Sequence, residues 1–265
     1  MSHLGKFAED CRLIRATAPL IHNITNYVAM GFSANALLAV GASPLMSSEP
    51  DEMEDISAIS SALVINIGCL EQGQMKAMGI AAEAAMKSRK PWVLDPVGAG
   101  ASRLRTETAA ELLHRFRPSV VRGNASEILA LCGIPARSRG VDSAEESKDA
   151  VRHAMELARK CGTVVSVSGP VDYITDGQEV NSVCNGSPLM PSVTAMGCTA
   201  SALTAAFLAV DADTLEAASC AMALMGVAGE KAAAESDGPG SLTVKFIDTL
   251  YNLNPEEAYG MIRHE

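Results

Sequence analysis

The fold is decided by residues 92–131, WVLDPVGAGASRLRTETAAELLHRFRPSVVRGNASEILAL. This stretch contains two short, mostly apolar runs, at Trp92–Leu94 and Ser119–Val121. Each run is followed by a segment with helical periodicity, at Thr106–Phe116 and Ala125–Leu131. Apolar runs of this length that alternate with helices are typical of parallel strands buried on both faces of a sheet. The stretch therefore predicts a strand–helix–strand–helix unit.

The same alternation extends along the chain in both directions. Further strands are predicted over Ala42–Leu45, Ala62–Asn66 and Thr163–Ser168, and further helices over Asn26–Val40, Glu71–Arg89, Ala144–Lys160, Gly197–Val210, Thr214–Ser236 and Ser241–Leu253. The pattern changes once, where Val171–Thr175 and Gln178–Val183 flank Asp176-Gly177, a pair typical of a type I′ hairpin turn. We expect a single α/β domain over residues 1–265, with a mostly parallel central sheet, one antiparallel hairpin and helices on both faces.

Composition argues against several classes of protein. The net charge of −10, without a run rich in lysine or arginine, disfavours binding to nucleic acids or to anionic membranes. The first 20 residues lack an apolar signal-peptide core, and no segment reaches the length of a membrane span. The seven cysteines are scattered singly, which disfavours a disulfide framework or a zinc site. We therefore expect a cytoplasmic protein that binds neither nucleic acids nor membranes.

Polar residues and glycines follow several candidate strands. Ligands of open parallel sheets bind beyond the carboxyl ends of the strands, so these positions are candidate site residues. Asp95 follows the strand at 92–94 and is suited to a hydrated divalent ion. The glycines after Asp95 form neither a G-x-G-x-x-G pattern nor a Walker A loop, so the sequence does not support either of those phosphate-binding turns.

The segment VTAMGCTASA, residues 193–202, is a turn with small residues that opens into an alanine-rich helix. The free amides of a helical first turn and the aligned peptide dipoles attract anions. Gly197 and Cys198 are therefore candidates for stabilising a phosphoryl group during its transfer. The structural alternative is an ordinary helix start with a buried cysteine.

A second candidate segment is RGNASE, residues 122–127, where a strand ends and a helix begins. Arg122 is positioned to reach a phosphate, and Glu127 to hold water on Mg²⁺. Asn124 and Glu127 also have the spacing of a capping box, which is the structural alternative. The segment HNITN, residues 22–26, is polar and opens a helix, and its residues alone favour a cap and turn over a ligand site.

Taken together, these segments resemble the hydroxyethylthiazole kinase family of the ribokinase-like superfamily. The matching stretches are HNITNYV (22–28), ANALLAVGASPLM (34–46), NIG (66–68), WVLDPVGAGA (92–101), RGNASEI (122–128), SVSGPVDYITDG (166–177), VTAMGCTASAL (193–203) and SDGPGS (236–241). They occur in the family's order across nearly the whole chain. The resemblance implies a three-layer ribokinase-like fold.

The resemblance also implies the activity, which is the ATP- and Mg²⁺-dependent phosphorylation of 4-methyl-5-(2-hydroxyethyl)thiazole in thiamine salvage. Homotrimers with sites at the subunit interfaces are implied as well. The carried-over roles are ATP binding for Arg122, Asn124 and Ser168, Mg²⁺ and phosphate for Asp95 and Glu127, the thiazole pocket for Asn26, Val28, Met46 and Ala195, and the catalytic anion hole for Gly197 and Cys198.

One position of the catalytic turn departs from the family pattern, and another differs from the wider superfamily. The family pattern has glycine where this chain has Ala195, and a Cβ costs roughly 1–2 kcal/mol if the position needs positive φ. Cys198 occupies the position where most of the superfamily has an aspartate base. A thiol is a poor base for an alkanol, so we expect positioning, Mg²⁺ and the anion hole to provide most of the rate acceleration. A covalent role for Cys198 would need a neighbouring histidine.

Three alternatives remain open at the level of sequence. One is another ribokinase-like kinase, of the hydroxymethylpyrimidine or pyridoxal type. The second is a nucleotide-dependent hydro-lyase of similar fold, which would carry an aspartate in the helix-start turn where Cys198 stands here. The third is a binder of thiamine precursors without catalytic activity, which Ala195 leaves open.

Overall fold

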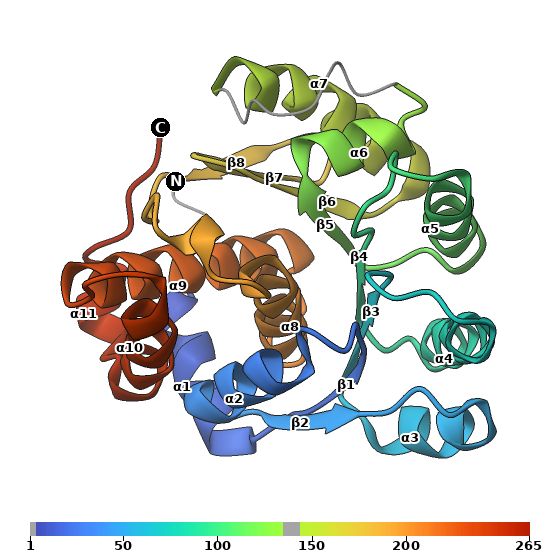
Figure 1. The fold of residues 1–265 in the computed structure, drawn as a ribbon, viewed down its shortest axis with the longest axis horizontal. Coiled ribbons are helices and arrows are strands. Elements are labelled where there is room, and N and C mark those ends of the chain that lie inside the picture. The colour runs from blue at the N-terminus through green and yellow to red at the C-terminus, as the bar shows by residue number, and fades with distance from the viewer. Residues whose placement is uncertain (1–3, 135–143) are drawn as a thin grey trace.

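A computed structural model describes residues 4–134 and 144–265 of the protein. Within these residues, eight strands form one sheet in the order β2-β1-β3-β4-β5-β6-β7-β8 (Figure 1). The strands are β1 (Leu20–Ile24), β2 (Ser43–Met46), β3 (Ala62–Asn66), β4 (Trp92–Asp95), β5 (Val120–Asn124), β6 (Val164–Ser168), β7 (Asp172–Thr175) and β8 (Val180–Val183). The strands from β1 to β6 pair in parallel, and β7 and β8 are antiparallel. The predicted mostly parallel sheet with one hairpin is confirmed.

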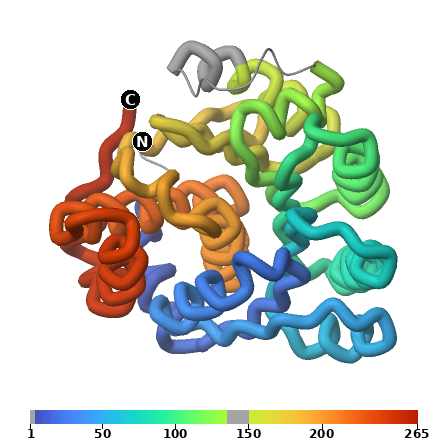
Figure 2. The backbone as a smooth tube through the Cα atoms, viewed as in Figure 1, coloured from blue at the N-terminus to red at the C-terminus, as the bar shows by residue number. Residues whose placement is uncertain are grey.

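Helices cover both faces of the sheet (Figure 1). They are α1 (Phe7–Thr17), α2 (Met30–Val40), α3 (Met53–Ile59), α4 (Gln72–Ser88), α5 (Arg103–Phe116), α6 (Ala125–Leu131), α7 (Ala144–Cys161), α8 (Met196–Leu208), α9 (Thr214–Ala234), α10 (Pro239–Asn252) and α11 (Pro255–Tyr259), with short 3-10 helices η1 (Pro50–Glu52) and η2 (Met190–Ser192). The backbone trace in Figure 2 shows α3 to α6 along one side of the sheet, and α2 and α8 to α10 along the other.

Two hydrophobic cores lie on the two faces, and the strands contribute alternate residues to each. In β3, Val64 belongs to the core shared with α8 and α9, whereas Leu63 and Ile65 belong to the core shared with α4 and α5. In β4, Val93 belongs to the core shared with α8 and α9, and Leu94 to the core shared with α4 and α5. This division explains why β3 and β4 are apolar up to their last residues, Asn66 and Asp95, because neither face of the sheet is open to water.

Strand β1 is missing from the sequence-based prediction and lies inside the sheet, between β2 and β3. The HNITN segment was interpreted there as a cap and turn, and that interpretation is wrong for its first three residues. His22 and Asn23 are buried, and their side chains hydrogen-bond to the carbonyl oxygens of Ser47 at 3.1 Å and Ile21 at 2.8 Å. The two polar residues disguised the strand, because an apolar pattern does not show that each places one side-chain nitrogen in a hydrogen bond inside the fold.

The predicted hairpin is correct, but its predicted turn type is wrong. Four residues, 176–179, connect β7 to β8, and among them only Gly177 has positive φ, at 93°. A type I′ turn needs positive φ at both central residues. Here the Asp176 carboxylate instead accepts hydrogen bonds from the amides of Gln178 at 2.7 Å and Glu179 at 2.8 Å. The aspartate thus stabilises the turn through its side chain.

Two bulk properties of the described chain bear on the class of protein. Across the described residues, no helix combines the length and the apolar character that crossing a membrane requires. All seven cysteines are free thiols, and five of them are only partly buried.

Candidate active site

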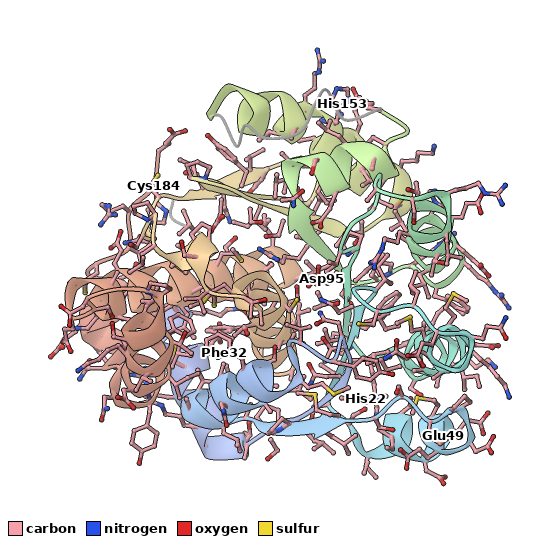
Figure 3. All side chains as sticks on the ribbon, in the orientation of Figure 1. His22, Phe32, Glu49, Asp95, His153 and Cys184 are labelled. Atoms are coloured by element: carbon pink, nitrogen blue, oxygen red, sulfur yellow. The ribbon has the colours of Figure 1, made fainter. Side chains whose placement is uncertain are left out.

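The candidate site lies where the carboxyl ends of the central strands meet the start of α8. Helix α8 packs against β3 and β4, and Asp95 is the last residue of β4. Figure 3 shows Asp95 near the middle of the molecule, between the sheet and the helices of the α8 side. The segment predicted to carry the chemistry therefore lies next to the carboxylate predicted to serve a divalent ion.

Asp95 is buried and held by two side chains. Its Oδ2 accepts hydrogen bonds from Asn66 Nδ2 at 2.7 Å and from Ser201 Oγ at 2.8 Å. Burial raises the pKa of Asp95 to about 6, against the opposing effects of the Arg122 charge and of these two bonds, while the Glu127 charge adds to the rise. The charged carboxylate is thus incompletely compensated by its protein neighbours.

A chain of hydrogen bonds joins Asp95 to Cys198. Asn66 receives, on its Oδ1, a bond of 3.0 Å from Asn26 Nδ2, which also donates to Cys198 Sγ at 3.2 Å. The orientation of Asn26 is set by its own Oδ1, which accepts from the amide of Ala29 at 3.0 Å. The asparagine after β1, the asparagine that ends β3 and the cysteine of α8 therefore form one polar network.

Cys198 is a protonated thiol in this environment. Burial raises its pKa above the ordinary value, and the neighbouring Asp95 charge raises it further, whereas bonds from Asn26 and Asn66 and the Arg122 charge oppose the change. In the described part of the chain, no histidine hydrogen-bonds to Cys198. The sulfur therefore lacks the partner that a covalent mechanism would use.

Helix α8 begins after a residue in the left-handed conformation. Ala195, at its N-cap, has φ 70° and ψ 0°. The position therefore requires positive φ, and the alternative of ordinary backbone geometry is wrong. An alanine in this conformation stores roughly 1–2 kcal/mol of strain that a glycine would not.

Gly197 is required for a different reason, which is close approach. Arg122 donates through Nη1 to the carbonyl oxygen of Gly197 at 2.9 Å. A Cβ on residue 197 would lie 2.9 Å from the same nitrogen. The absent side chain lets the guanidinium lie against the first turn of α8.

Glu127 forms the predicted capping box with Asn124. Its Oε2 accepts from the Asn124 amide at 2.9 Å, and the Asn124 Oδ1 accepts from the Glu127 amide at 2.9 Å. The second oxygen of Glu127 accepts from the amide of Gly98 at 2.9 Å. This glutamate thus connects the loop after Asp95 to the start of α6. The predicted capping box of Asn124 and Glu127 is confirmed.

A cleft of about 580 Å³ opens beside this arrangement, between the ends of β5 and β6 and the helices α8 and α9. The residues that line it include four predicted for ATP or catalysis, Arg122, Asn124, Ser168 and Gly197. The loop after β8, residues 184–188, forms one wall and was not foreseen. The structure thus gathers residues from three separate motifs around one cavity.

Asp172 also lines the cleft and was missed by the sequence analysis. It is buried, and it accepts from the amide of Gly169 at 3.0 Å. Burial raises its pKa to about 7, with the Gly169 bond and the Arg122 charge opposing. Nothing local marked it, since an aspartate at the start of a strand after Gly-Pro is a common turn pattern.

Two residues predicted for the thiazole pocket lie apart from this network. Val28 follows β1 and its exposed fraction is 65%. Met46 ends the edge strand β2 and is partly buried. Of the four predicted substrate residues, Asn26 contacts Cys198 directly and Ala195 precedes the same turn.

Asn66 and Ser201 are the central residues that sequence reasoning passed over. Asn66 is the last residue of β3 and pairs in register with Asp95. It lies within the strand, whereas the candidate positions are those that follow each strand. Ser201 lies one turn after Gly197 on α8, and only the packing of α8 on β4 reveals its bond to Asp95.

A model of the hydroxyethylthiazole kinase family matches residues 11–256. The chain belongs to this family. A hydroxyethylthiazole kinase of Nitratidesulfovibrio vulgaris (strain DP4) is 53% identical over 254 residues, which are 96% of this chain and 95% of that protein. The family suggested by the motifs is therefore confirmed, and with it the class of enzyme, a phosphotransferase.

Solved structures agree with this membership and with the fold. A hydroxyethylthiazole kinase structure from Pyrococcus horikoshii OT3 has a TM-score of 0.90 at 41% identity and covers 98% of both chains. A ribokinase-like superfamily protein from Enterococcus faecalis V583 has a TM-score of 0.68 at 15% identity, covering 92% of this chain and 89% of that one. The second likeness bears on the fold alone, and the predicted ribokinase-like fold is confirmed.

Proposed function

We propose that this chain transfers the γ-phosphate of ATP to the hydroxyl of 4-methyl-5-(2-hydroxyethyl)thiazole, the reaction used in thiamine salvage. The proposal depends on one observation: the first turn of α8 faces the cleft on one side and the Asn26 network on the other. Gly197 lines the cleft, whereas the next residue, Cys198, bonds to Asn26. A phosphoryl group at this turn would have the nucleotide on one side and the acceptor hydroxyl on the other.

The cleft side is suited to the triphosphate of ATP. Arg122 supplies a planar guanidinium, and Asn124 and Ser168 supply neutral hydrogen-bonding groups at neighbouring strand ends. The amides at the start of α8 supply donors that are fixed before the reaction begins. Because phosphoryl transfer depends mainly on positioning and on charge stabilisation, these groups account for the chemistry without a strong base.

Asp95 and Glu127 fit a magnesium ion that is held mostly by the nucleotide. The described residues contain no cluster of three or more metal-binding side chains, which agrees with an ion held by one or two carboxylates and phosphate oxygens. Both hydrogen bonds to Asp95 go to Oδ2, and its charge is incompletely compensated. Both oxygens of Glu127 accept backbone amides, so this residue fits a water-mediated role. When bound, the ion would neutralise charge on the phosphates.

The acceptor side would consist of Asn26, Val28, Met46 and Ala195. Val28 is 65% exposed in the single chain, which supports a pocket completed by a second subunit. We therefore include a homotrimer with sites at its interfaces in the proposal. Light scattering coupled to size-exclusion chromatography measures this directly, and a monomer at assay concentration would contradict it.

We also propose that the chain works as a single domain in the cytoplasm.

The central test is a coupled assay of ADP formation with Mg·ATP and three alcohols: the thiazole alcohol, hydroxymethylpyrimidine and pyridoxal. We expect the thiazole alcohol to give the highest kcat/KM, and mass spectrometry to find its monophosphate. An Asp95→Asn variant serves as the inactive control. Equal ADP formation without any alcohol, or a preference for another alcohol, would refute the assignment. Binding of the thiazole alcohol by calorimetry without ADP formation would favour a non-catalytic binder.

A further inference from the structure

One wall of the cleft is a loop that has no regular secondary structure of its own. Residues 184–188 follow β8, and Cys184, Asn185 and Gly186 line the cavity. Asn185 is buried, and a Cβ on Gly226 of α9 would lie 2.6 Å from its carbonyl oxygen. The loop therefore rests directly on the backbone of α9.

Glu230, one helical turn after Gly226, holds this loop through both carboxylate oxygens. Its Oε2 accepts from Asn185 Nδ2 at 2.9 Å, and its Oε1 accepts from the amide of Gly186 at 3.0 Å. Burial alone would raise the pKa of Glu230, but bonds from Arg263, Asn185 and Gly186 outweigh it and lower the pKa. The residue is therefore a carboxylate at neutral pH and a strong acceptor.

Arg263 approaches the same carboxylate from residues 261–265. Its Nη1 lies 3.1 Å from Glu230 Oε2, and its Nη2 pairs with Oε1 of the same carboxylate and donates to the Cys184 carbonyl oxygen at 3.2 Å. Its backbone adds two contacts, since its carbonyl accepts from the Cys184 amide at 2.8 Å and its amide donates to Asn185 Oδ1 at 2.7 Å. One arginine thus contacts three residues that hold or form the wall.

Neighbouring contacts attach the rest of the segment 261–265 to the same region. The Met261 carbonyl accepts from Asn185 at 3.0 Å, and the Glu265 amide donates to Ser182 Oγ at 2.9 Å. Figure 3 shows Cys184 beside the course of the chain toward its C-terminus. Residues 261–265 lie beyond the part of the chain that matches the family model, which ends at residue 256.

We propose that residues 261–265 form a strap that fixes one wall of the nucleotide cleft, with Arg263 and Glu230 as the positioning residues. The inference rests on the proposed function, because it concerns the cleft assigned to ATP. A loop held in its binding conformation loses little entropy when the nucleotide binds, whereas a released loop must be ordered at that moment. The side chains of Cys198, Asn26 and Asp95 hydrogen-bond within the network around Asn66 and Ser201, on elements other than the strap. Release of the strap therefore weakens nucleotide binding and leaves the transfer step unchanged.

The test compares Arg263→Ala and Arg263→Lys with the control Arg12→Ala. Arg12 also pairs with a glutamate, Glu256, and its side chain is exposed to a similar degree, 59% against 56% for Arg263. The Arg12–Glu256 pair is a matched control because it does not bond to the cleft wall, whereas Arg263 and Glu230 bond to Cys184, Asn185 and Gly186. We expect Arg263→Ala to raise KM for ATP about tenfold, since it removes a bidentate charged pair. Its kcat and its KM for the alcohol should stay within about twofold of wild type. Arg263→Lys should recover part of the loss, and Arg12→Ala should match wild type.

An unchanged KM for ATP in folded Arg263→Ala would overturn the proposal, as would a joint loss of kcat and of both KM values. If Arg263→Ala does not fold, the KM for ATP of Arg263→Lys provides the test. A KM raised about threefold supports the strap, and a KM equal to that of wild type refutes it. Calorimetry with ADP separates this inference from the proposed function, because it needs no alcohol. Wild-type ADP binding that weakens in Arg263→Ala supports the strap even if the thiazole alcohol is not phosphorylated.

Discussion

The side-chain amide of Asn26 donates a hydrogen bond to the sulfur of Cys198 across 3.2 Å, although 172 positions separate the two residues. Through Asn66 the same amide is connected to Asp95. The contact brings the loop after β1 to the first turn of α8. It therefore couples a segment proposed for the alcohol to the turn proposed for the phosphoryl group.

Replacing Cys198 by alanine should leave measurable turnover. The thiol pKa is raised above its ordinary value, so the sulfur is protonated at neutral pH and contributes little as a base. We expect Cys198→Ala to keep kcat within about tenfold of wild type, and Asp95→Ala to lose more than about a hundredfold through poor handling of Mg·ATP. Steady-state kinetics of both variants at saturating ATP provides the measurement.

The pH dependence of kcat gives an independent check on Cys198. Because its pKa lies above the ordinary value of 9.0, the thiol should not titrate between pH 6 and pH 8. Wild type and Cys198→Ala should therefore have kcat profiles of the same shape over this range. An inflection in the wild-type profile that disappears in the variant would contradict the assignment, as would an inactive Cys198→Ala beside a near-normal Asp95→Ala.

Ala195→Gly should stabilise the protein. Ala195 has φ 70°, and a glycine there removes a strain of roughly 1–2 kcal/mol from the folded state. Glycine also raises the conformational entropy of the unfolded chain, which lowers stability by about 0.4–1 kcal/mol. We expect a net gain on the order of 1 kcal/mol, measured by urea unfolding. The matched control is Ala84→Gly in the middle of α4, which should cost about 1 kcal/mol. Equal destabilisation by both changes would show that the turn is not strained.

Gly197→Ala should weaken nucleotide binding by displacing Arg122. The backbone of Gly197 is not in the positive-φ region, so the added methyl acts by contact alone, at 2.9 Å from Arg122 Nη1. We expect KM for ATP to rise by about tenfold or more, while thermal stability changes by only a few degrees. Nucleotide affinity equal to that of wild type would mean that the bond between Arg122 and the Gly197 carbonyl has no role in the cleft.

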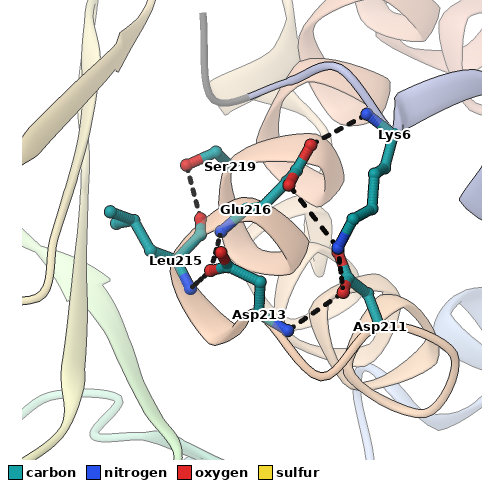
Figure 4. Close-up of polar contacts among 6 residues, drawn as sticks. All are labelled: Lys6, Asp211, Asp213, Leu215, Glu216 and Ser219. Carbon is teal, nitrogen blue, oxygen red and sulfur yellow. Dashed lines mark hydrogen bonds and ion pairs between the residues drawn. The ribbon is translucent and has the colours of Figure 1, made fainter.

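Asp10 should make stability depend on pH. Burial raises its pKa to about 7, and the charges of Asp211 and Glu216 add to this effect against that of Lys6. Figure 4 shows Lys6 bound to both Asp211 and Glu216. The folded state holds the Asp10 proton more tightly than the unfolded state, so stability falls as pH rises from about 4 to 7.

Asp10→Asn removes this penalty at high pH. The variant should therefore be more stable than wild type by on the order of 2 kcal/mol at pH 8, and the difference should vanish near pH 4. Chemical unfolding at a series of pH values measures it. Glu9→Gln, an exposed change on the same helix, is the control and should show a much smaller trend, because the Glu9 charge is the last and smallest of the causes that raise the Asp10 pKa. A constant difference between Asp10→Asn and wild type at all pH values would exclude titration as the cause.

Features that depend on near neighbours in the chain were predictable. The parallel strands, most helices and the capping box of Asn124 and Glu127 follow from periodicity and spacing, because each is stabilised within a few residues. Strand β1 was not predictable in this way. Its buried His22 and Asn23 imitate a polar turn, and the bond from His22 to the Ser47 carbonyl, in the segment after β2, forms only once the sheet has folded.

The sequence by itself determined the family, the alternation of strands and helices and the identity of the residues at the strand ends. Only the tertiary structure decided that Ala195 adopts positive φ, that Asn66 and Ser201 hold Asp95, and that Arg263 supports the cleft wall. The physical reason is distance along the chain. Local propensities act over a few residues, whereas Ser201 lies 106 positions from the Asp95 that it contacts, and only the packing of α8 on the sheet brings them together.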